Sequence, residues 1–583
     1  MSPAIRYSKD LGPGDFDKEA TIEGWVQEVR ALGGIAFVIV RDRYGTVQIA
    51  VPKKKVPPEL FSAMTSVSRE SVVRISGTVK KSDQAKAGLE MVPSSMEVMS
   101  AAQSPLPMGV VDKVSVETET RFDQRFMDLR KPETRAVFEV KSVALRLIDE
   151  YLVRNGFVEV FTPKIVASGA EGGATLFGID YFGRKAYLAQ SPQLYKQMLM
   201  STGLDRVFEI GPAFRAEPSD TIRHVSEFIS FDGEMAHISS MRDVLDVLEG
   251  CVQYTVEGVA REASDHVARI GTEVRVPRTP YPVITYSDAL DMVVAEGMDL
   301  KMGDDLGTEG EKALGKVMAD KGYDVYWIVE YPEEAKPFYI MEKDGTPFSY
   351  SFDLDYCGQE IASGGQREHR YDRLVERFRK KGLEPEAFRF YTNAFAYGMP
   401  PHGGWGLGVE RLVQKMLGLP NIRETILFPR DRNRLTGLEQ DSITFFVAGE
   451  PQPKGSTRSF YVKKVDRVVT TTTNKNTKHW QLRVATEAQH ANEARGVSFF
   501  SPEKECAYEV EALFLFPRPK SLPRRVRMNT RRPDVDKLAR AVLDGLADIL
   551  IPDDSQVVML SARKRYIGEG ETPGARICVR RVR

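Results

Sequence analysis

The distribution of charge divides this chain into two segments of opposite sign. Residues 441–583 carry 26 Lys and Arg against 17 Asp and Glu, a net charge of +9, whereas residues 1–440 carry 55 against 65, a net charge of −10. The full length of 583 residues also exceeds what one hydrophobic core usually serves. The sequence therefore predicts several units that fold separately, and its basic segment is a candidate for binding nucleic acid.

The four cysteines, Cys251, Cys357, Cys506 and Cys578, lie far apart in the sequence and form no C-x-x-C pair or Cys/His cluster. This spacing excludes a disulfide framework and a zinc finger, and it is typical of a reducing cytosol. The first twenty residues are charged and have no apolar core, unlike a signal peptide. The longest apolar run, Ile35–Val40, is too short to span a bilayer. We expect a cytoplasmic protein that engages no membrane.

Runs of β-branched and helix-period residues divide the chain into four parts. The first part predicts a small barrel or sandwich, because turn residues separate its short strands. These strands are Thr21–Val29, Ile35–Arg41, Thr46–Val51 and Val72–Val79. After a connector, a larger α/β section opens with a helix-period stretch at Val137–Tyr151, and the basic module opens with a strand-like run at Ile443–Val447. We place the four parts at residues 1–103, 104–130, 131–438 and 439–583.

The α/β section contains neither a Walker A sequence nor G-x-G-x-x-G, so a nucleotide would need another scaffold. Val207–Glu217 and the segment 227–235 flank a polar loop and predict a long antiparallel hairpin. Side chains alternate along a strand, so one face of the second strand would carry an aromatic ring and two carboxylates beside Arg215. The residues on that face are Phe228, Ser230, Asp232 and Glu234. An ordinary solvated sheet face has the same pattern.

Two later segments carry groups suited to a metal and a phosphate. Asp353 and Asp355 alternate with apolar residues along one predicted strand, and Glu360 follows. Asp353 and Glu360 could jointly hold Mg²⁺, which takes one or two carboxylates plus phosphate oxygens. Gly403–Leu412 reads as a glycine-rich turn that enters a helix, with Arg411 in its first turns, which favours a phosphate. Taken alone, it is only a turn.

Together these segments resemble the three signature motifs of class II aminoacyl-tRNA synthetases. The similar stretches are residues 156–163 for motif 1, 214–217 for motif 2 and 406–411 for motif 3. A finer similarity to archaeal-type aspartyl-tRNA synthetases rests on EGG at 171–173, QSPQLYKQ at 190–197, SGGQREHR at 363–370 and PPHGGWGLGVER at 400–411. The resemblance covers residues 15–438. It implies an N-terminal OB-fold β-barrel and an α/β catalytic domain whose antiparallel sheet is flanked by helices.

The resemblance also implies an ATP site with Mg²⁺. Arg215 would grip the α-phosphate, Glu217 would meet the adenine amino group, and Phe228 would stack on the adenine ring. Arg223, His224 and Arg411 would approach the outer phosphates. The whole implied ATP-binding set is Arg215, Glu217, Arg223, His224, Phe228, Glu360, Gly408, Val409, Glu410 and Arg411, with Asp353 joining Glu360 on the metal.

For the amino acid, the resemblance implies a clamp on an acidic side chain. Lys196 and Arg367 would hold the side-chain carboxylate of L-aspartate, and Ser363 would assist. The implied aspartate-binding set is Glu171, Gln193, Lys196, Arg215, Asp232, Ser363 and Arg367, in which Glu171, Gln193 and Asp232 meet the ammonium group. Two cations facing the neutral amide of asparagine would leave buried charge unmatched, at a cost of about 2–5 kcal/mol. The reaction needs no protein nucleophile, and Arg215 and Arg411 would act catalytically by stabilising charge.

The N-terminal barrel would hold the anticodon of tRNA(Asp). The resemblance places Phe37 where an aromatic stacks on a base and Gln48 where a glutamine reads a base edge, and Glu90 is a further candidate for the anticodon site. The pattern around Phe37 alone favours an ordinary core aromatic. Gln27 and the pair Asp83-Gln84 match neither pattern that decides charging of tRNA(Asn), so this question stays open. The alternatives for this half are an asparaginyl-tRNA synthetase and a tRNA-independent asparagine-forming paralogue. Arg367 with Lys196 argues against the first, and a complete OB domain against the second.

The basic segment carries a second set of acidic residues. Residues 518–533 contain seven Lys and Arg and no acid, and they lead into a predicted amphipathic helix with apolar residues at Leu538, Val542, Leu546 and Ile549. Asp534 and Asp536 precede the helix, and Asp553 and Asp554 follow it. A helix cap and a turn would explain one aspartate each. Four carboxylates beside a basic strip favour a metal-dependent nuclease.

Residues 442–583 resemble the RusA-type Holliday junction resolvases, through FFVAGEPQPKGS at 445–456 and D-x-D, helix, D-D-S-Q-V. The resemblance implies a small α+β domain that cleaves four-way DNA junctions with Mg²⁺. Asp534, Asp536 and Asp554 would be catalytic metal ligands with Asp553 adjacent, and Arg540 stands where the family has a catalytic lysine. The alternatives are a DNA-binding appendage that does not cleave, and an artificial join. Relatives of both halves are homodimers, so we expect a homodimer.

Overall fold

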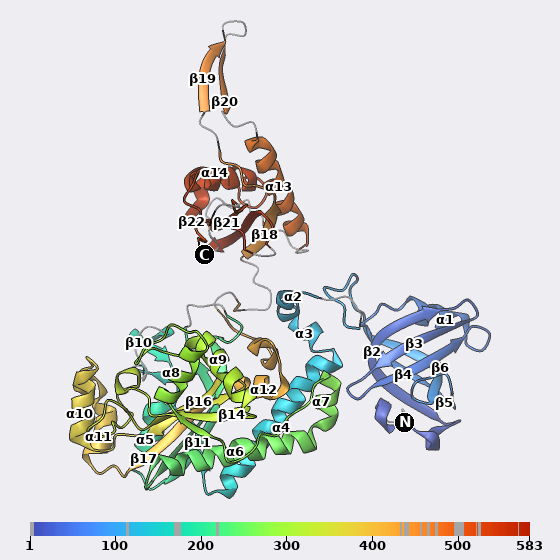
Figure 1. Cartoon of the computed structure of the whole chain (residues 1–583). Helices are drawn as coiled ribbons and strands as arrows, with labels where there is room; N and C mark the ends of the chain where they lie inside the picture. The colour runs from blue at the N-terminus through green and yellow to red at the C-terminus, as the bar shows by residue number, and fades with distance from the viewer. Residues whose placement is uncertain are drawn as a thin grey trace. The chain divides into compact units, whose positions relative to one another are not determined.

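The structure is a computed structural model that describes residues 5–111, 116–167, 169, 176–216, 221–431, 434–435, 442–454, 457–462, 467–472, 476–494, 499, 506–519, 522, 526–568 and 571–582. It divides into two compact units, Met1–Gly437 and Leu438–Arg583 (Figure 1). Each unit has a hydrophobic core of its own. No helix within the described ranges is long and apolar enough to cross a bilayer.

A closed β-barrel forms the start of the first unit. Its strands run in the order β1-β2-β3-β4-β6-β5, and an additional pairing of β2 with β5 closes the barrel. The elements are β1 (Ile5–Arg6), β2 (Glu19–Ala31), β3 (Ile35–Arg41), β4 (Thr46–Pro52), α1 (Pro58–Ser66), β5 (Val72–Lys81) and β6 (Leu89–Ser100). The four predicted strands are confirmed. Alternate residues of these strands, such as Val38 and Ile49, are fully buried inside the barrel.

An eight-stranded sheet organises the rest of the first unit, in the order β13-β14-β15-β16-β17-β12-β11-β7. Its strands are β7 (Val158–Glu159), β11 (Arg206–Phe214), β12 (Glu227–Ala236), β13 (Val283–Thr285), β14 (Val325–Val329), β15 (Ser351–Tyr356), β16 (Glu360–Gln366) and β17 (His402–Gly408). β11 and β12 form the predicted antiparallel hairpin. A smaller sheet contains β8 (Ile165–Val166), β9 (Gly178–Tyr181) and β10 (Arg184–Leu188).

Helices cover this sheet. α4 (Pro132–Arg154) contains the predicted stretch Val137–Tyr151 and packs against α6 (Met241–Glu262) (Figure 1). Apolar residues of α4, α6 and α12 meet the sheet around Trp327 and Trp405 in the largest core. The remaining helices are α2 (Thr118–Asp123), α3 (Arg125–Asp128), α5 (Gln193–Leu199), α7 (Ser264–Ile270), α8 (Tyr286–Ala295), α9 (Gly307–Asp320), α10 (Tyr371–Lys380), α11 (Arg389–Ala396) and α12 (Val409–Leu417).

The prediction of a glycine-rich turn at Gly403–Leu412 is wrong for the first half of this segment. Residues up to Gly408 form β17, a central strand, and the helix α12 begins at Val409. Glycine is needed there because neighbours leave no room for a side chain. A Cβ on Gly404 would lie 2.1 Å from the Gly233 carbonyl oxygen and 2.2 Å from a carboxylate oxygen of Glu234.

The second unit is a small α+β domain. Its sheet has the order β18-β23-β21-β22, and α13 and α14 pack on it around a core that includes Trp480 and Leu538. The elements are β18 (Ser442–Ala448), β19 (Thr457–Val462), β20 (Arg467–Thr472), α13 (Thr477–Ala494), β21 (Ala507–Phe516), α14 (Val535–Leu546), β22 (Val557–Tyr566) and β23 (Gly574–Val582). The predicted helix is confirmed to Leu546, but Ile549 lies in the turn that follows.

Candidate functional site

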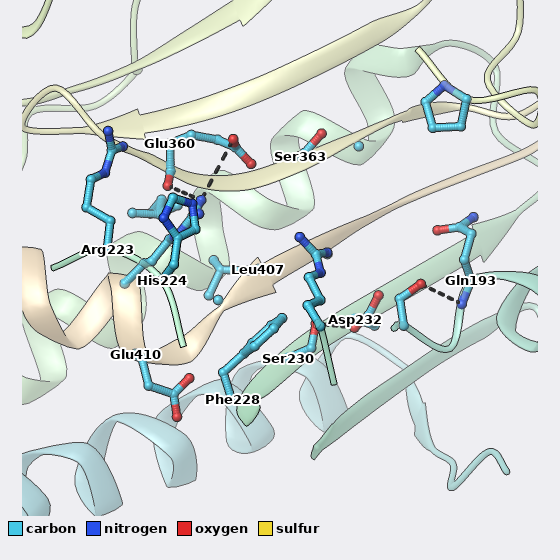
Figure 2. Close-up of a pocket in the computed structure, with 18 of the residues that line it drawn as sticks. Gln193, Arg223, His224, Phe228, Ser230, Asp232, Glu360, Ser363, Leu407 and Glu410 are labelled. Atoms are coloured by element: carbon cyan, nitrogen blue, oxygen red, sulfur yellow. Dashed lines mark hydrogen bonds and ion pairs between the residues drawn. The ribbon is translucent and has the colours of Figure 1, made fainter. Parts of the chain in front are cut away.

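A cavity of about 350 Å³ in the first unit gathers most of the predicted site residues (Figure 2). They come from α5, the β11–β12 hairpin and its loop, β16, and the β17–α12 junction. The predicted residues that line the cavity are Gln193, Arg215, Arg223, His224, Phe228, Asp232, Glu360, Ser363, Arg367, Gly408, Glu410 and Arg411. Two further predicted residues, Glu171 and Glu217, lie outside the described residues.

Strand register places three of the predicted residues in one row. Asp232 of β12 pairs with Gly406 of β17, Gly406 pairs with Ser363 of β16, and Ser363 pairs with Asp353 of β15. Directly opposed residues of antiparallel strands point to the same face of a sheet. Strands β12, β16 and β15 therefore present Asp232, Ser363 and Asp353 on one side of the sheet.

Lys196 and Arg367, the predicted carboxylate clamp, converge on Glu234, which the sequence pattern did not assign to the clamp. Arg367 Nε lies 3.0 Å from Glu234 Oε1 and its Nη2 lies 3.2 Å from Oε2, while Lys196 Nζ lies 3.6 Å from Glu234 Oε2. Lys196 Nζ also donates to Asp232 Oδ1 at 2.9 Å and to the Trp405 carbonyl oxygen at 2.6 Å. The four charged side chains are buried and form one compact cluster.

Opposite charge keeps Glu234 and Arg367 ionised despite their burial. Burial alone would raise the pKa of Glu234, but the charges of Arg367 and Lys196 outweigh it and hold that pKa below its ordinary value. Burial likewise disfavours the charged form of Arg367, but the Glu234 carboxylate raises the pKa of Arg367. An acidic ligand entering beside Arg367 would therefore meet cations that are already desolvated and oriented.

Arg215 and Phe228, predicted for the α-phosphate and the adenine ring, are neighbours. The guanidinium carbon of Arg215 lies 5.4 Å from the centroid of the Phe228 ring. Ser230, two residues along β12, donates from its hydroxyl to Asp232 Oδ2 at 2.5 Å. Phe228, Ser230 and Asp232 all line the cavity, as their alternation along the strand requires (Figure 2). An aromatic face beside a cation suits a base joined to phosphate.

Glu360 and Asp353, the predicted Mg²⁺ ligands, lie among several charges. Lys336 Nζ is 3.0 Å from Asp353 Oδ1, and Arg411 donates to the Glu360 carbonyl oxygen at 2.9 Å and lies 3.8 Å from its carboxylate. Burial and the Asp353 charge raise the pKa of Glu360, although Arg411 and Lys336 oppose the change. Carboxylates that repel each other fit a cation held by one or two of them and by phosphate oxygens.

The loop of the β11–β12 hairpin brings two basic side chains, Arg223 and His224, to the lining of the cavity. Arg223 forms an ion pair with Glu311 of α9, and the Glu311 carboxylate accepts the backbone N–H of Glu360 at 3.2 Å. His224 Nδ1 lies 2.7 Å from Thr221 Oγ1. Glu311 therefore links the loop to the predicted metal end, a connection that the sequence pattern did not indicate.

The side chains of two predicted ATP-site residues have structural roles. The Glu410 carboxylate lies 2.6 Å from Lys141 Nζ and accepts the Ile229 backbone N–H at 3.0 Å, so it ties α12 to α4 and β12. The Val409 side chain is fully buried in the main core. Any contact of Val409 with a nucleotide would have to come from its backbone.

Phe37 does not lie in the barrel core, so the expectation from its sequence pattern alone is wrong. Val38 is fully buried inside the barrel, whereas Phe37 is half-buried on the opposite face of β3. Ile39, on the same face as Phe37, pairs with Gln48 of β4. Gln48 Nε2 in turn donates to Glu90 Oε2 at 3.0 Å. The three predicted anticodon residues therefore share the outer face of the barrel.

In the second unit, Asp534, Asp536 and Arg540 are exposed at the start of α14. Asp534 occupies the cap position, but its side chain makes no capping hydrogen bond, and Lys537 Nζ lies 3.7 Å from its carboxylate. Asp553 instead accepts the Ser555 backbone N–H at 2.8 Å in the turn before β22. Capping therefore accounts for Asp553 and leaves Asp534 for another role.

The two acidic pairs of the second unit lie at opposite ends of α14. Lys564, near the end of β22, donates to the Pro533 carbonyl oxygen at 2.7 Å, so that end of the strand lies beside the helix start. Asp553 and Asp554 precede the other end of β22, and the twelve residues of α14 span about 18 Å. Within the described ranges, no three His, Cys, Asp or Glu side chains lie close enough to hold a metal ion. The predicted carboxylates thus form no single metal site within one chain.

Comparison with known proteins decides the family of the larger unit. Residues 117–432, more than half of the chain, match the family model of tRNA synthetases class II (D, K and N). The chain belongs to the class II tRNA synthetases. Within this family it is similar to the aspartate–tRNA(Asp) ligase of Pyrococcus abyssi, with 50% identity over 431 residues that cover 74% of this chain and 98% of the relative.

Other members of the family differ in the tRNA named for them. The aspartate–tRNA(Asp/Asn) ligase of Methanothermobacter thermautotrophicus is 48% identical over 431 residues, covering 74% of this chain and 98% of that relative. Among solved structures, asparaginyl-tRNA synthetase from Pyrococcus horikoshii with asparaginyl-adenylate has a TM-score of 0.69 at 33% identity, covering 74% of this chain and 99% of that one. Aspartyl tRNA synthetase from Entamoeba histolytica has a TM-score of 0.67 at 32% identity, covering 75% and 93%.

Two further family models match outside the synthetase core. Residues 20–99 match the OB-fold nucleic acid binding domain, and residues 450–580 match Endodeoxyribonuclease RusA. The fold class predicted from the sequence is therefore confirmed for all three parts, the barrel, the synthetase core and the RusA domain. In this synthetase, a domain of a different family follows the barrel and the antiparallel sheet with its helices.

Three charged residues of this synthetase site were not predicted as site residues. Glu234 lies on the face of β12 that the alternation had identified, so its position could be found but its partners could not. Lys336 and Glu311 reach the site from a loop and from α9, and both partner predicted groups. Neither belongs to a segment with a recognisable motif, so no sequence signal placed them at the site.

Proposed function

We propose that the chain ligates L-aspartate to tRNA(Asp) with ATP, through an aspartyl-adenylate. The observation that carries this proposal is the convergence of Lys196 and Arg367 on Glu234, beside the part of the cavity that Arg367 lines, because paired buried cations favour an acidic side chain over a neutral one. The 50% identity with an archaeal aspartate–tRNA(Asp) ligase supports the same substrate.

In this proposal Lys196 and Arg367 hold the side-chain carboxylate of aspartate, and Ser363 assists them. Asp232 and Gln193 hold the ammonium group, which leaves the α-carboxylate directed at ATP. The register of β12 sets the direction of Asp232. Helical spacing sets the direction of Gln193, since Gln193 and Lys196 are three residues apart on α5. The predicted role of Glu171 is to join Asp232 at the ammonium.

Catalysis in this proposal rests on positioning and charge stabilisation. The aspartate α-carboxylate attacks the α-phosphorus of ATP, and pyrophosphate leaves. Arg215 stabilises charge on the α-phosphate while Phe228 and Glu217 hold the adenine, and Arg223, His224 and Arg411 hold the outer phosphates. The 3′-terminal hydroxyl of the tRNA then takes the aspartyl group from the adenylate and releases AMP.

Asp353 and Glu360 would hold Mg²⁺ together with phosphate oxygens. Both side chains supply carboxylate oxygens, which Mg²⁺ prefers. Burial, and then the charge of Asp353, raise the pKa of Glu360, and a bound cation would favour its charged form. When bound, Mg²⁺ supplies Lewis-acid neutralisation of phosphate charge. Lys336 and Arg411 complete the cationic side of this end of the cavity.

We further propose that the outer face of the barrel receives the anticodon. A half-buried Phe37 beside the hydrogen-bonded pair Gln48 and Glu90 offers one stacking surface and two groups for reading base edges. Relatives named for tRNA(Asp) and for tRNA(Asp/Asn) are almost equally similar to this chain. Overall identity therefore does not separate the two specificities.

The experiment that tests the function is aminoacylation of purified tRNA(Asp) and tRNA(Asn), side by side, by the full-length protein with ATP, Mg²⁺ and aspartate or asparagine. We expect aspartate on tRNA(Asp) and no asparagine on either tRNA. Aspartate on tRNA(Asn) as well would add the broader specificity. Aminoacylation with asparagine, or no aminoacylation with either amino acid, would contradict the proposal.

We propose a second activity for residues 439–583, the Mg²⁺-dependent cleavage of four-way DNA junctions. The RusA family match supports it, and Asp534, Asp536 and Asp554 are the proposed metal ligands, with Arg540 in place of the family lysine. The test compares junction cleavage by wild type and Asp536→Asn. Equal cleavage by both proteins would contradict a role for Asp536, and binding without cleavage by wild type would leave a DNA-binding appendage.

We propose that the protein is a homodimer. In the first unit, Val158, Phe161 and Ile165 are exposed apolar residues in and next to the segment that resembles motif 1. In the second unit, β22 is an edge strand of the described sheet and exposes Val558, Met559 and Leu560. Light scattering should give about twice the chain mass of 65.4 kDa. A monodisperse monomer would contradict this proposal.

A dimer through β22 would also explain the separated acidic pairs of the second unit. The beginning of β22 follows Asp553 and Asp554, and its end lies beside Pro533 and Asp534. Antiparallel pairing of two β22 strands would set the beginning of one strand against the end of the other. The acidic pairs of two copies would then approach each other.

All four cysteines are free thiols, which supports a cytoplasmic location.

A further inference from the structure

A file of hydrogen-bonded side chains runs from the proposed substrate clamp into the core. Arg367 Nη2 donates to Gln193 Oε1 at 3.5 Å, and Gln193 Nε2 donates to Gln197 Oε1 at 2.9 Å. The Gln197 Nε2 and His402 Nε2 atoms are 3.1 Å apart, and His402 Nδ1 lies 2.8 Å from the Pro400 carbonyl oxygen. All four side chains are buried. The file therefore joins the cavity to a residue that does not line it.

The two ends of the file fix the direction of every hydrogen bond in it. The Pro400 carbonyl can only accept, so His402 must carry its proton on Nδ1. In a neutral imidazole, Nε2 is then an acceptor, which requires Gln197 to present its NH₂ group to His402 and its carbonyl oxygen to Gln193. The guanidinium of Arg367 can only donate, so Gln193 must present its carbonyl oxygen to that end. Both ends demand the same orientation of the two amides.

Burial makes this orientation hard to reverse. A protonated His402 would turn Nε2 into a donor that faces the NH₂ group of Gln197, and a buried donor without an acceptor costs about 1–3 kcal/mol. Three ionisable groups act on the ring, since Glu234 favours its charged form and Arg367 and His369 oppose it. Burial outweighs them and lowers the pKa of His402 to about 4. The imidazole is neutral throughout the physiological range.

We propose that His402 is a positioning residue for the amino-acid substrate, which acts through Gln197 to hold the Gln193 carbonyl oxygen toward Arg367 and the cavity. This inference rests on the proposed function, in which Gln193 accepts from the substrate ammonium. A reversed Gln193 amide would point its NH₂ group at both the ammonium and Arg367. His402 therefore affects aspartate binding without touching aspartate.

The first experiment measures aspartate-dependent pyrophosphate exchange by His402→Phe in the full-length protein. Phenylalanine keeps the ring but offers Gln197 no acceptor, so KM for aspartate should rise about tenfold while KM for ATP stays within about twofold. His402→Gln places an acceptor near the former Nε2 and should restore much of the aspartate affinity. Equal changes in both KM values, or no rescue by glutamine, would overturn the proposal.

Tyr281→Phe is the matched control for a buried hydrogen bond lost elsewhere in the same unit. Tyr281 is buried and donates to Gln253 Oε1 at 3.1 Å, at residues that do not line the cavity. This variant should lose thermal stability and keep both KM values. A rise in its KM for aspartate that matched His402→Phe would reduce the effect to general destabilisation and overturn the proposal.

A second measurement needs no destabilising variant. Nitrogen NMR of wild type labelled in its seven histidines reports the tautomer of each ring, and loss of a signal in His402→Gln assigns His402. We expect a neutral ring protonated on Nδ1 at neutral pH. Protonation on Nε2, or a charged ring, would overturn the proposal even if His402→Phe failed to fold. If wild type showed no aspartate-dependent exchange, the proposed function would fail, and the tautomer would still decide the direction of the file.

Discussion

At the scale of single residues, Glu234 neutralises the cations proposed to receive the substrate. It lies within 3.6 Å of Lys196 and forms two contacts with Arg367, all of them buried. Removing one partner of a buried ion pair typically costs about 3–5 kcal/mol, because the remaining charge is left uncompensated. The stability of the free enzyme and the affinity of the clamp for a carboxylate therefore depend on the same side chain.

We predict that Glu234→Gln lowers the melting temperature of the first unit, and that aspartate raises the melting temperature of this variant more than that of wild type. The added carboxylate would replace the charge that the substitution removes. Differential scanning fluorimetry with and without aspartate checks both effects. Glu262→Gln, at a surface ion pair with Arg146, is the control and should change little. An unchanged melting temperature for Glu234→Gln would count against the charge cluster.

We predict that His402 lowers the free energy of unfolding in acid. Its pKa falls from 6.5 in the unfolded chain to about 4 in the fold, so the unfolded state binds the proton first. Above pH 6.5 the group has no effect, and as pH falls from 6.5 to 4 it removes up to about 3 kcal/mol of the free energy of unfolding. Urea unfolding across this range should show a shallower loss for His402→Gln than for wild type. Parallel curves would contradict the lowered pKa.

Single residues also show how far the sequence could predict the site. The resemblance assigned Lys196 and Arg367 to one clamp, and the structure brings both side chains to Glu234. The same reasoning could not choose the partner of either cation, since Glu234 meets them only after β12 pairs with β17 and α5 packs beside it. The apolar pattern alone, unlike the resemblance, misplaced Phe37, because a run of apolar residues does not reveal which face of a strand is buried.

At the scale of elements, β17 determines the geometry of the site. Its glycines allow β12 and β16 to lie close on either side and leave room for the Glu234 side chain. Local propensity reads a glycine-rich stretch as a turn. Here the packing of neighbouring strands overrides that propensity, and a single sequence contains no signal for the override. The amphipathic helix and the alternating strands were predicted well because their periodicity is set by the element itself.

We predict that Gly404→Ala destabilises the first unit by about 3 kcal/mol, because overpacking between central strands must move backbone atoms. The new Cβ would meet the Gly233 carbonyl oxygen at 2.1 Å. Gly34→Ala is the control, since a Cβ there meets nothing within 4 Å. Chemical denaturation of both variants provides the comparison. A Gly404→Ala protein as stable as Gly34→Ala would contradict the close packing of β17.

At the scale of the whole molecule, the chain joins units of different families and opposite charge. The first unit belongs to the class II tRNA synthetases and the second matches RusA, and each encloses its own core. The change in the sign of the charge near residue 440 coincides with the boundary between the two units. Fold and family could be predicted from motifs, whereas the separation of the acidic pairs along α14 could not, because it depends on how β22 returns beside the helix.

We propose that Lys196 and Arg367 make the larger unit specific for an acidic amino acid. Pyrophosphate exchange by the full-length protein, with aspartate and with asparagine, tests it most directly in wild type, Arg367→Ala and Arg370→Ala. Arg370 belongs to the same segment but pairs with Glu368 and does not line the cavity. We predict a wild-type preference for aspartate of at least about a hundredfold, from an unmatched buried charge of at least about 3 kcal/mol. Arg367→Ala should abolish exchange with aspartate, and Arg370→Ala should preserve it. Wild-type exchange with asparagine equal to that with aspartate, or full activity in Arg367→Ala, would contradict the account.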